Sequence, residues 1–279
     1  MAKHTVELQS GDKVTYWSHN DSRKQTLVLI HGFTGTHEGF QYLVPLLSDF
    51  RLIIPDLPGF GVSPLPHHKL TLAELGKLLT QFIQKLELEK PNLIGHSMGS
   101  LVVAEAIRQH PELFAKELVL ASPVPTPIKW IDSRKVGAVA SGLYYSASHR
   151  LPVVGKRLST SKPITKFSTN LIMTTKDVEM RDKIHRHHYD NLNYISHIGW
   201  YKQLNRQINR TGISHYKSAL SKFDVLIING DNDAVTPLKH QKKTADIINA
   251  KLITIPEVGH LAHYEKPTDL AAAIVDFLR

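Results

Sequence analysis

Six short apolar runs, each about as long as one β-strand, are spread along the chain. They lie at residues 26–30, 51–54, 92–94, 117–120, 225–228 and 251–255. Because each run is apolar at consecutive positions, both faces of the predicted strand must be covered, as in a parallel sheet. Amphipathic helical patterns accompany these runs at residues 72–86, 97–109 and 267–278. The alternation predicts an α/β fold with a doubly wound, mostly parallel sheet.

An antiparallel hairpin is predicted before the first apolar run. Residues 5–9 and 13–17 alternate between apolar and polar side chains, and the turn-forming residues Ser10-Gly11-Asp12 join them. With these two strands the predicted sheet has eight strands in all.

The strand–helix alternation stops once, between residues 123 and 221. No buried-strand run appears there, and the pattern is helical, with breaks at Pro152, Pro163, Gly199 and Gly212. We call residues 123–221 the helical insert and predict that it forms a helical cap, or lid, between two strands. Residues 1–122 and 222–279 are then the core that carries the sheet.

Positive charge is concentrated in and around the helical insert. The chain has 34 Lys and Arg against 25 Asp and Glu, which gives a net charge of +9. Residues 124–222 hold 17 of these basic residues and 5 of the acidic ones, so the rest of the chain is slightly acidic. A basic block often binds nucleic acid or anionic lipid. Since no nucleic-acid motif accompanies it, we interpret it as a solvated surface and expect no nucleic-acid partner.

Composition excludes several classes of protein. The chain has 0 cysteines, which rules out disulfides, cysteine nucleophiles and Cys-based metal sites. No apolar run approaches the roughly 18 residues of a membrane span. The first residues, Met1 to Glu7, are polar and lack the apolar stretch of a secretory signal. We therefore expect a cytoplasmic protein without integral membrane association.

The segment Gly95-His96-Ser97-Met98-Gly99 carries the strongest functional signal. It lies between a predicted strand and a predicted helix. Glycines two residues on either side of the serine permit a tight turn, because a Cβ at either place would collide with neighbouring backbone. Such a turn holds the serine hydroxyl above the sheet, at the positive end of the helix. We interpret Ser97 as a nucleophile; the alternative is a helix N-cap.

Together with this turn, four further motifs resemble the α/β-hydrolase superfamily. They are the oxyanion loop at His31-Gly32-Phe33, the glycine-rich turn at residues 56–63, the acid loop at residues 230–237 and the histidine loop at Gly259-His260. They stand in the family's order, and each follows a predicted strand. The resemblance implies an α/β-hydrolase fold with a helical cap inserted into it.

A Ser-His-Asp triad is predicted from Ser97, His260 and Asp233. A serine hydroxyl needs a base within hydrogen-bond reach, and histidine suits this because its pKa lies near neutral pH. A buried carboxylate then orients the imidazole. Asp231 is the alternative acid, but the resemblance aligns Asp233 with the family's acid. His263 is the alternative base, although only His260 directly follows the loop glycine.

The oxyanion hole implied by the resemblance consists of the backbone N–H groups of Phe33 and Met98. The Phe33 ring is predicted to line the acyl pocket, with a purely packing role as the alternative. His31 and Asp56 are assigned structural roles in their loops, because the triad is complete without them.

Two further groups of side chains lie in the helical insert. His185, His187 and His188 form the one histidine cluster of the sequence, and we interpret it as solvated rather than metal-binding. Eight aromatic residues are predicted to pack the insert onto the core, and some of them to line the substrate pocket. They are Trp130, Tyr144, Tyr145, Phe167, Tyr189, Tyr194, Trp200 and Tyr201.

The sequence predicts a serine hydrolase that cleaves small or medium-sized carboxylic esters through an acyl-enzyme. The motifs resemble those of serine esterases and monoglyceride-lipase-like enzymes, and also those of hydrolases that cleave carbon–carbon bonds of ring-fission products. Carbon–carbon hydrolysis is therefore the second hypothesis. A ligand-sensing receptor of this fold is the third. The partner is a small-molecule ester, and we expect no cofactor and no metal.

Overall fold

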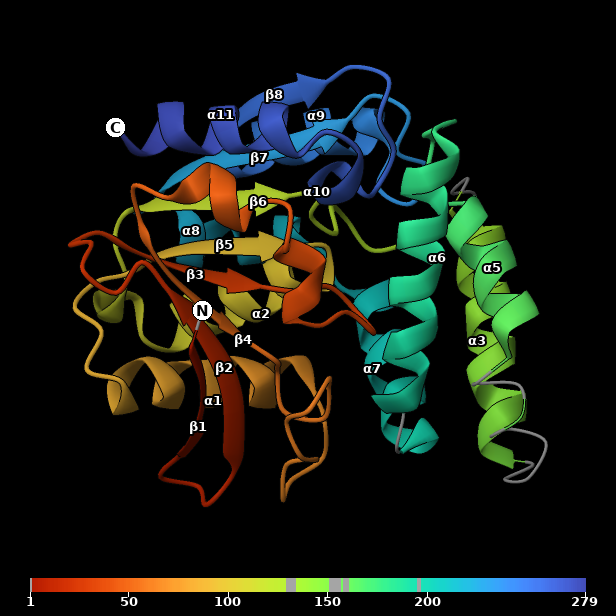
Figure 1. The fold of residues 1–279 in the computed structure, drawn as a ribbon, viewed down its shortest axis with the longest axis horizontal. Helices are drawn as coiled ribbons and strands as arrows, with labels where there is room; N and C mark the ends of the chain where they lie inside the picture. The colour runs from red at the N-terminus through yellow and green to blue at the C-terminus, as the bar shows by residue number, and fades with distance from the viewer. Residues whose placement is uncertain (1, 129–133, 151–156, 158–160, 195–196) are drawn as a thin grey trace.

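The structure is a computed structural model that describes residues 2–128, 134–150, 157, 161–194 and 197–279. It has a central eight-stranded sheet with the strand order β1-β2-β4-β3-β5-β6-β7-β8 (Figure 1). The strands are β1 (Ala2–Glu7), β2 (Lys13–His19), β3 (Thr26–Ile30), β4 (Arg51–Pro55), β5 (Asn92–His96), β6 (Glu117–Ala121), β7 (Asp224–Gly230) and β8 (Lys251–Ile255).

Strand directions confirm the predicted mostly parallel sheet. β1 pairs with β2, and β2 with β4, in antiparallel fashion, while every other neighbouring pair is parallel. The first strand begins and ends earlier than the predicted residues 5–9. It lies at the edge of the sheet and is largely exposed, so burial does not fix its limits.

Alternate residues of the strands enter two separate apolar clusters, one on each face of the sheet. In β3, for example, Val28 and Ile30 belong to the first cluster, and Leu27 and Leu29 to the second. All four side chains are fully buried. The consecutive apolar residues of this run thus reflect a strand covered on both sides.

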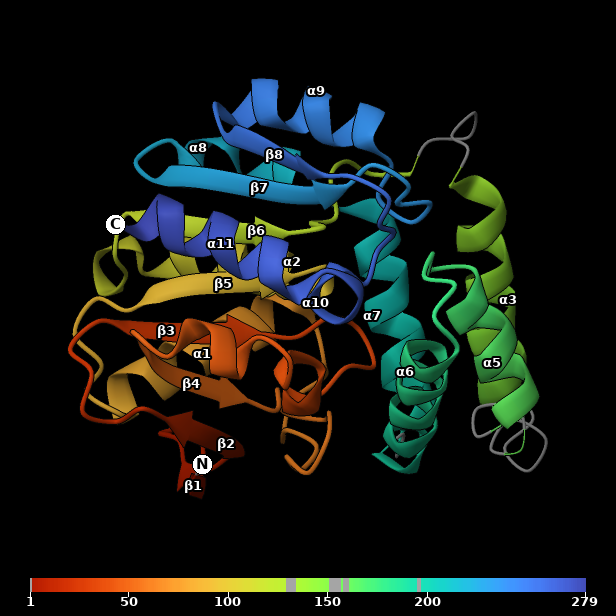
Figure 2. The ribbon, with the colours of Figure 1, turned by 45° about the horizontal axis from the view of Figure 1, so that its top comes forward.

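Helices cover both faces of the sheet, which makes the fold doubly wound (Figure 2). The first cluster contains side chains of α1 (Leu72–Lys85), α2 (Met98–Gln109) and α9 (Leu238–Ile248). The second contains side chains of α11 (Pro267–Leu278), η1 (His37–Phe40) and η2 (Val44–Leu47). A short helix, α10 (Ala262–Glu265), precedes α11.

Most of the helical insert lies beyond the carboxyl ends of the parallel strands, as Figures 1 and 2 both show, but its last residues, 213–220, pack with α2 and α9 on one face of the sheet. Its helices are α3 (Lys135–Arg150), α5 (Lys162–Asn170), α6 (Val178–Asn191), α7 (Ile198–Arg210) and α8 (Lys217–Leu220). Pro163 and Gly199 are the second residues of α5 and α7, so they lie at helix starts, while Gly212 follows the end of α7. Pro152 lies outside the described residues.

Hydrogen bonds from two tyrosines attach the helical insert to the core. The Tyr201 hydroxyl donates to the Gly59 carbonyl at 2.7 Å, and the Tyr216 hydroxyl donates to the Glu105 carboxylate at 2.8 Å. Tyr201 also packs against Phe60. None of the helices in the described part of the chain is long and apolar enough to cross a membrane.

Candidate active site

Ser97 occupies a strained turn between β5 and α2. Its backbone angles are φ 51° and ψ −118°, in the left-handed half of the map that side chains rarely adopt. A Cβ on Gly99 would lie 2.2 Å from the Ile30 carbonyl oxygen, and one on Gly95 would lie 2.8 Å from the Ser100 Cα. Both glycines are therefore required for the strand and helix to meet this closely.

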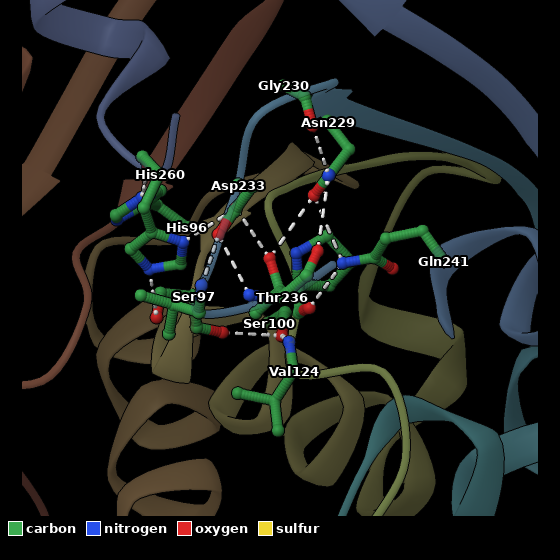
Figure 3. Close-up of polar contacts among 12 residues, drawn as sticks. His96, Ser97, Ser100, Val124, Asn229, Gly230, Asp233, Thr236, Gln241 and His260 are labelled. Atoms are coloured by element: carbon green, nitrogen blue, oxygen red, sulfur yellow. Dashed lines mark hydrogen bonds and ion pairs between the residues drawn. The ribbon is translucent and has the colours of Figure 1, made fainter. Parts of the chain in front are cut away.

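The three predicted triad side chains come together at the carboxyl ends of the strands (Figure 3). The Ser97 Oγ lies 3.0 Å from the His260 Nε2, and the His260 Nδ1 lies 2.8 Å from the Asp233 Oδ2. A carboxylate only accepts, so the His260 Nδ1–H donates to Asp233 and leaves Nε2 free to accept the serine proton. His260 and Asp233 are buried, whereas Ser97 is half-buried and accessible to a ligand.

The acid loop holds the Asp233 carboxylate with three further hydrogen bonds. The backbone N–H groups of Val235 and Thr236 donate to Oδ1, each at 2.8 Å, and the Thr236 hydroxyl donates to Oδ2 at 2.6 Å. Burial by itself raises the pKa of Asp233, but the charge of His260 and the hydrogen bonds from His260 and Thr236 outweigh it. The net pKa lies well below its usual value, so the carboxylate is ionised at neutral pH.

Asp231, the alternative acid, lies exposed on the same loop. Its backbone N–H donates to the Ile255 carbonyl. The described structure shows no hydrogen bond between its carboxylate and His260, so the geometry pairs His260 with Asp233.

A buried polar network behind the acid loop was missed by sequence reasoning. The Asn229 amide donates to the carbonyls of Gly230 and Thr236, at 2.8 and 3.2 Å. The Gln241 amide donates to the Asn229 Oδ1 at 3.1 Å and to the Pro123 carbonyl at 2.7 Å (Figure 3). The one feature of the sequence that could have indicated this network is Asn229, a polar residue near the end of an otherwise apolar strand. The network fixes the loop that carries Asp233.

The histidine loop is held from two sides. The buried His96 donates from Nε2 to the His260 carbonyl at 3.2 Å. From the helical insert, the Ile172 carbonyl accepts the His260 N–H at 3.1 Å. His263, the alternative base, is fully buried, and its ring packs against that of His96 at 4.2 Å between centroids. The structure thus places His260, rather than His263, beside Ser97.

The predicted oxyanion donors lie next to Ser97 in the chain or in space. Met98 is the first residue of α2, where the backbone N–H has no carbonyl partner within the helix. Gly32, which precedes Phe33, lies so close that a Cβ on it would be 3.2 Å from the Ser97 Cβ. The Phe33 amide donates to none of the residues that the structure describes. Its ring both borders the cavity and packs against Tyr145 and Tyr201.

A cavity of about 490 Å³ lies between these loops and the helical insert. Ser97 and His260 border it from the core, and three of the predicted aromatic residues, Tyr144, Tyr145 and Phe167, border it from the insert. Tyr201 packs behind Phe33, and Trp130 lies outside the described residues. The volume suits a small or medium-sized organic ligand.

The described lining of the cavity is uncharged apart from its histidines. None of the described residues that line it is Lys, Arg, Asp or Glu. Four lining histidines have a lowered pKa, chiefly because burial disfavours the charged form, and the value falls to about 3 for His96 and His188. The other two are His31 and His263. These four imidazoles are therefore neutral at pH 7.

The three histidines of the cluster on α6 contact four different residues. The His185 Nε2 lies 2.9 Å from the Asn170 Oδ1, and the His188 Nδ1 lies 2.7 Å from the Thr169 hydroxyl. The His187 Nδ1 bonds to the Tyr264 hydroxyl, and its Nε2 lies 3.2 Å from the Glu38 carboxylate. No group of three or more metal-ligating side chains is found among the described residues. Contrary to the prediction of a solvated cluster, His185 and His187 are buried.

His31 and Asp56 have structural partners. The His31 Nδ1–H donates to the Gly32 carbonyl at 2.8 Å, and its Nε2 accepts the Leu57 N–H at 3.0 Å. Asp56 accepts the backbone N–H groups of His37 and Val62, at 2.7 and 2.9 Å. Both side chains shape loops around the site.

Comparison with known proteins assigns the chain to a family. The family model described as alpha/beta hydrolase fold matches residues 25–267. The chain therefore belongs to the α/β-hydrolase family, as its motifs predicted.

Relatives agree with that assignment. An uncharacterized hydrolase of Bacillus subtilis, YugF, is 28% identical over 276 residues, which cover 96% of this chain and 95% of the relative. A thermophilic esterase from Thermogutta terrifontis superposes with a TM-score of 0.80 at 20% identity, covering 100% of this chain and 98% of the other. The enol-lactonase from Burkholderia xenovorans LB400 gives a TM-score of 0.80 at 16% identity, with 99% of both chains covered. The family and the Bacillus subtilis relative support hydrolase activity, while the two solved structures show the shared fold.

Proposed function

We propose that the protein is a serine hydrolase of neutral carboxylic esters of small to medium size. The observation that carries this proposal is the hydrogen-bonded chain from the Ser97 hydroxyl through His260 to the ionised Asp233. That arrangement supplies an activated nucleophile at the edge of a cavity.

The reaction has two half-reactions. The Ser97 Oγ attacks the ester carbonyl while the His260 Nε2 takes the hydroxyl proton, and His260 then gives that proton to the leaving alcohol. Asp233 stabilises the imidazolium that forms in between. Water, deprotonated by His260, attacks the acyl-enzyme and releases the acid and Ser97.

The N–H groups of Met98 and Phe33 are proposed to bind the oxyanion of each tetrahedral intermediate. Donors of this kind accelerate such reactions by roughly 10²- to 10³-fold each. They act through the backbone, so the Met98 and Phe33 side chains do not take part in that step. The strained turn at Ser97 fixes the Met98 amide relative to the nucleophile.

Neutral esters are favoured over ring-fission diketones because the described lining of the cavity has no Lys or Arg side chain. Ring-fission substrates carry carboxylates. Such a carboxylate would find no Lys or Arg partner among the described residues that line the cavity, and burying an unpaired charge is costly. The neutral state of His96 and His188 removes two more possible partners. This supports the ester hypothesis over carbon–carbon hydrolysis.

We further propose that residues 123–221 act as a cap over a core made of residues 1–122 and 222–279. Ala140 and Tyr144 of α3, with Phe167 and Leu171 from α5 and its C-terminal end, border the same cavity as Ser97. A substrate bound at Ser97 would contact these side chains, which are then the ones that select the acyl chain.

Kinetics with two substrate classes test the proposal. We expect rapid, repeated turnover of p-nitrophenyl esters and no cleavage of a carboxylate-bearing ring-fission diketone. Faster turnover of the diketone would contradict the ester assignment. A single slow turnover with the ligand left attached would instead support a receptor.

A further inference from the structure

The most exposed large apolar side chains of the described residues are concentrated in the helical insert. Five of them exceed all others, with exposed fractions from 46% to 73%: Val139, Leu143, Phe167, Leu171 and Val178. Those elsewhere, such as Leu46 and Ile253, reach only 39%. Exposed apolar residues gathered in one place mark a contact surface.

Four of the five residues belong to α3 and to α5 with its C-terminal end, and we call them the mouth patch: Val139, Leu143, Phe167 and Leu171. Both helices lie at the outer side of the molecule, away from the sheet, in Figures 1 and 2; α3 packs on α7 and α5 packs on α6, and both contribute side chains to the cavity lining. Phe167 and Leu171 also border the cavity that contains Ser97. Two of the four patch residues are thus exposed and border the cavity at the same time.

Positive charge accompanies the mouth patch. Between Asp132 and Asp177 the sequence has no acidic residue, and the described basic residues there that are exposed are Arg150, Arg157, Lys162, Lys166 and Lys176. Lys162 and Lys166 are exposed on α5, and neither forms an ion pair with a described residue, although the Lys162 Nζ lies 5.6 Å from the centroid of the Tyr189 ring. An exposed surface that is apolar and basic matches a negatively charged lipid surface in both respects.

We propose that the face formed by α3 and α5 docks reversibly on anionic phospholipid bilayers, so that neutral, lipid-soluble esters enter the cavity directly from the membrane. The substrate class rests on the proposed function, whereas the docking does not. Apolar side chains would enter the boundary between headgroups and acyl chains, and each nearby basic residue raises membrane partitioning about fivefold. A second copy of the chain fits this face poorly, because two basic surfaces would repel each other.

Vesicle co-sedimentation of the full chain tests the docking. The vesicles consist of phosphatidylcholine alone or mixed with phosphatidylglycerol. The test variants are Val139→Ser/Leu143→Ser, which removes apolar side chains outside the cavity lining, and Lys162→Glu/Lys166→Glu, which reverses the charge. The matched controls, Leu46→Ser/Ile253→Ser and Lys242→Glu/Lys243→Glu, make the same changes on exposed positions of the core.

We expect wild type and both controls to bind the anionic vesicles, and each test variant to bind at least about tenfold more weakly. Binding to phosphatidylcholine alone should be weak throughout. Equal binding by test variants and controls, or no binding by wild type, would overturn the proposal. So would a dimer that Val139→Ser/Leu143→Ser converts to a monomer in sedimentation velocity, because a second copy would then cover the patch.

Soluble p-nitrophenyl acetate separates this proposal from the proposed function. All four double variants should hydrolyse it at the wild-type rate, because none alters the cavity lining. Loss of vesicle binding with intact hydrolysis leaves the enzyme assignment untouched. Conversely, vesicle binding by a protein without esterase activity would contradict the proposed function and leave the docking standing.

Discussion

Side chains of the sheet enter two apolar clusters at alternate positions, whereas the helices of the insert bury part of each surface and leave several apolar residues in solvent. The core also holds Ser97, Asp233 and His260 through buried hydrogen bonds. The insert contributes apolar cavity walls and the chain's excess of basic over acidic residues. We infer from this difference that the core performs the proposed chemistry, and we propose that the insert governs access and substrate choice.

The largest expected effect is that of Ser97→Ala, in the core. We expect kcat/KM for p-nitrophenyl esters to fall by about 10⁴-fold or more, because the triad acts as a unit. The melting temperature should stay near that of wild type, since the hydroxyl is half-buried and lies at the cavity. Retained activity in the purified variant would refute the nucleophile assignment.

Asp233→Asn should reduce kcat by about 10³-fold, because an amide does not stabilise the imidazolium. Asp231→Asn is its matched control on the same loop, and there we expect less than about a threefold change because the carboxylate is exposed. Steady-state kinetics on both variants decide between them. If Asp231→Asn were the more damaging change, the pairing of Asp233 with His260 would not be the functional one.

A pair of glycine substitutions compares the two regions in stability. Gly99→Ala in the core places a Cβ 2.2 Å from the Ile30 carbonyl oxygen, and we expect a loss of more than about 3 kcal/mol in the free energy of unfolding. In Gly199→Ala of the insert, the Cβ comes no closer than 2.9 Å, to the ring of the exposed His149, which can move. We expect a change within about 1 kcal/mol there. Urea unfolding measures the free energy of unfolding of both variants. Equal losses in the two would contradict the expected difference between the core and the insert.

The smallest expected effect concerns how the free energy of unfolding depends on pH below neutrality. Burial, then the charge of His96, lowers the pKa of His263 well below its usual value, so the unfolded chain binds a proton that the folded one does not. Stability should therefore fall as pH drops below about 6.5, with His263 contributing up to about 1.4 kcal/mol per pH unit. Urea unfolding between about pH 5 and about pH 7 measures how steeply stability depends on pH. His263→Phe should make this dependence less steep, whereas the control His68→Phe, at an exposed position, should leave it unchanged. An unchanged slope in His263→Phe would show that this imidazole does not set it.

The sheet and the candidate site differ in how far sequence alone could define them. Apolar runs located every parallel strand to within one or two residues, because burial on both faces leaves few alternatives. Motifs at the strand ends selected Ser97, Asp233 and His260, which the structure brings together. The support from Asn229 and Gln241 was not predictable, because their contacts depend on how distant segments pack.

The insert was predictable only as a helical segment. Its helices have mixed polar and apolar surfaces, so their sequence does not specify which side meets the core. The burial of His185 and His187 shows this, since a histidine-rich helix had been interpreted as solvated. Nor did sequence reveal that Phe167 both borders the cavity and remains 67% exposed.

Covalent labelling with a fluorophosphonate ester, followed by intact-protein mass spectrometry and peptide mapping, tests the central claim most directly. The account predicts a single adduct on Ser97 that abolishes hydrolysis of p-nitrophenyl esters in proportion to labelling. Ser97→Ala should remain unlabelled, and Asp233→Asn should label much more slowly than Asp231→Asn. An adduct on another residue, or full esterase activity in protein labelled at Ser97, would contradict the proposed mechanism.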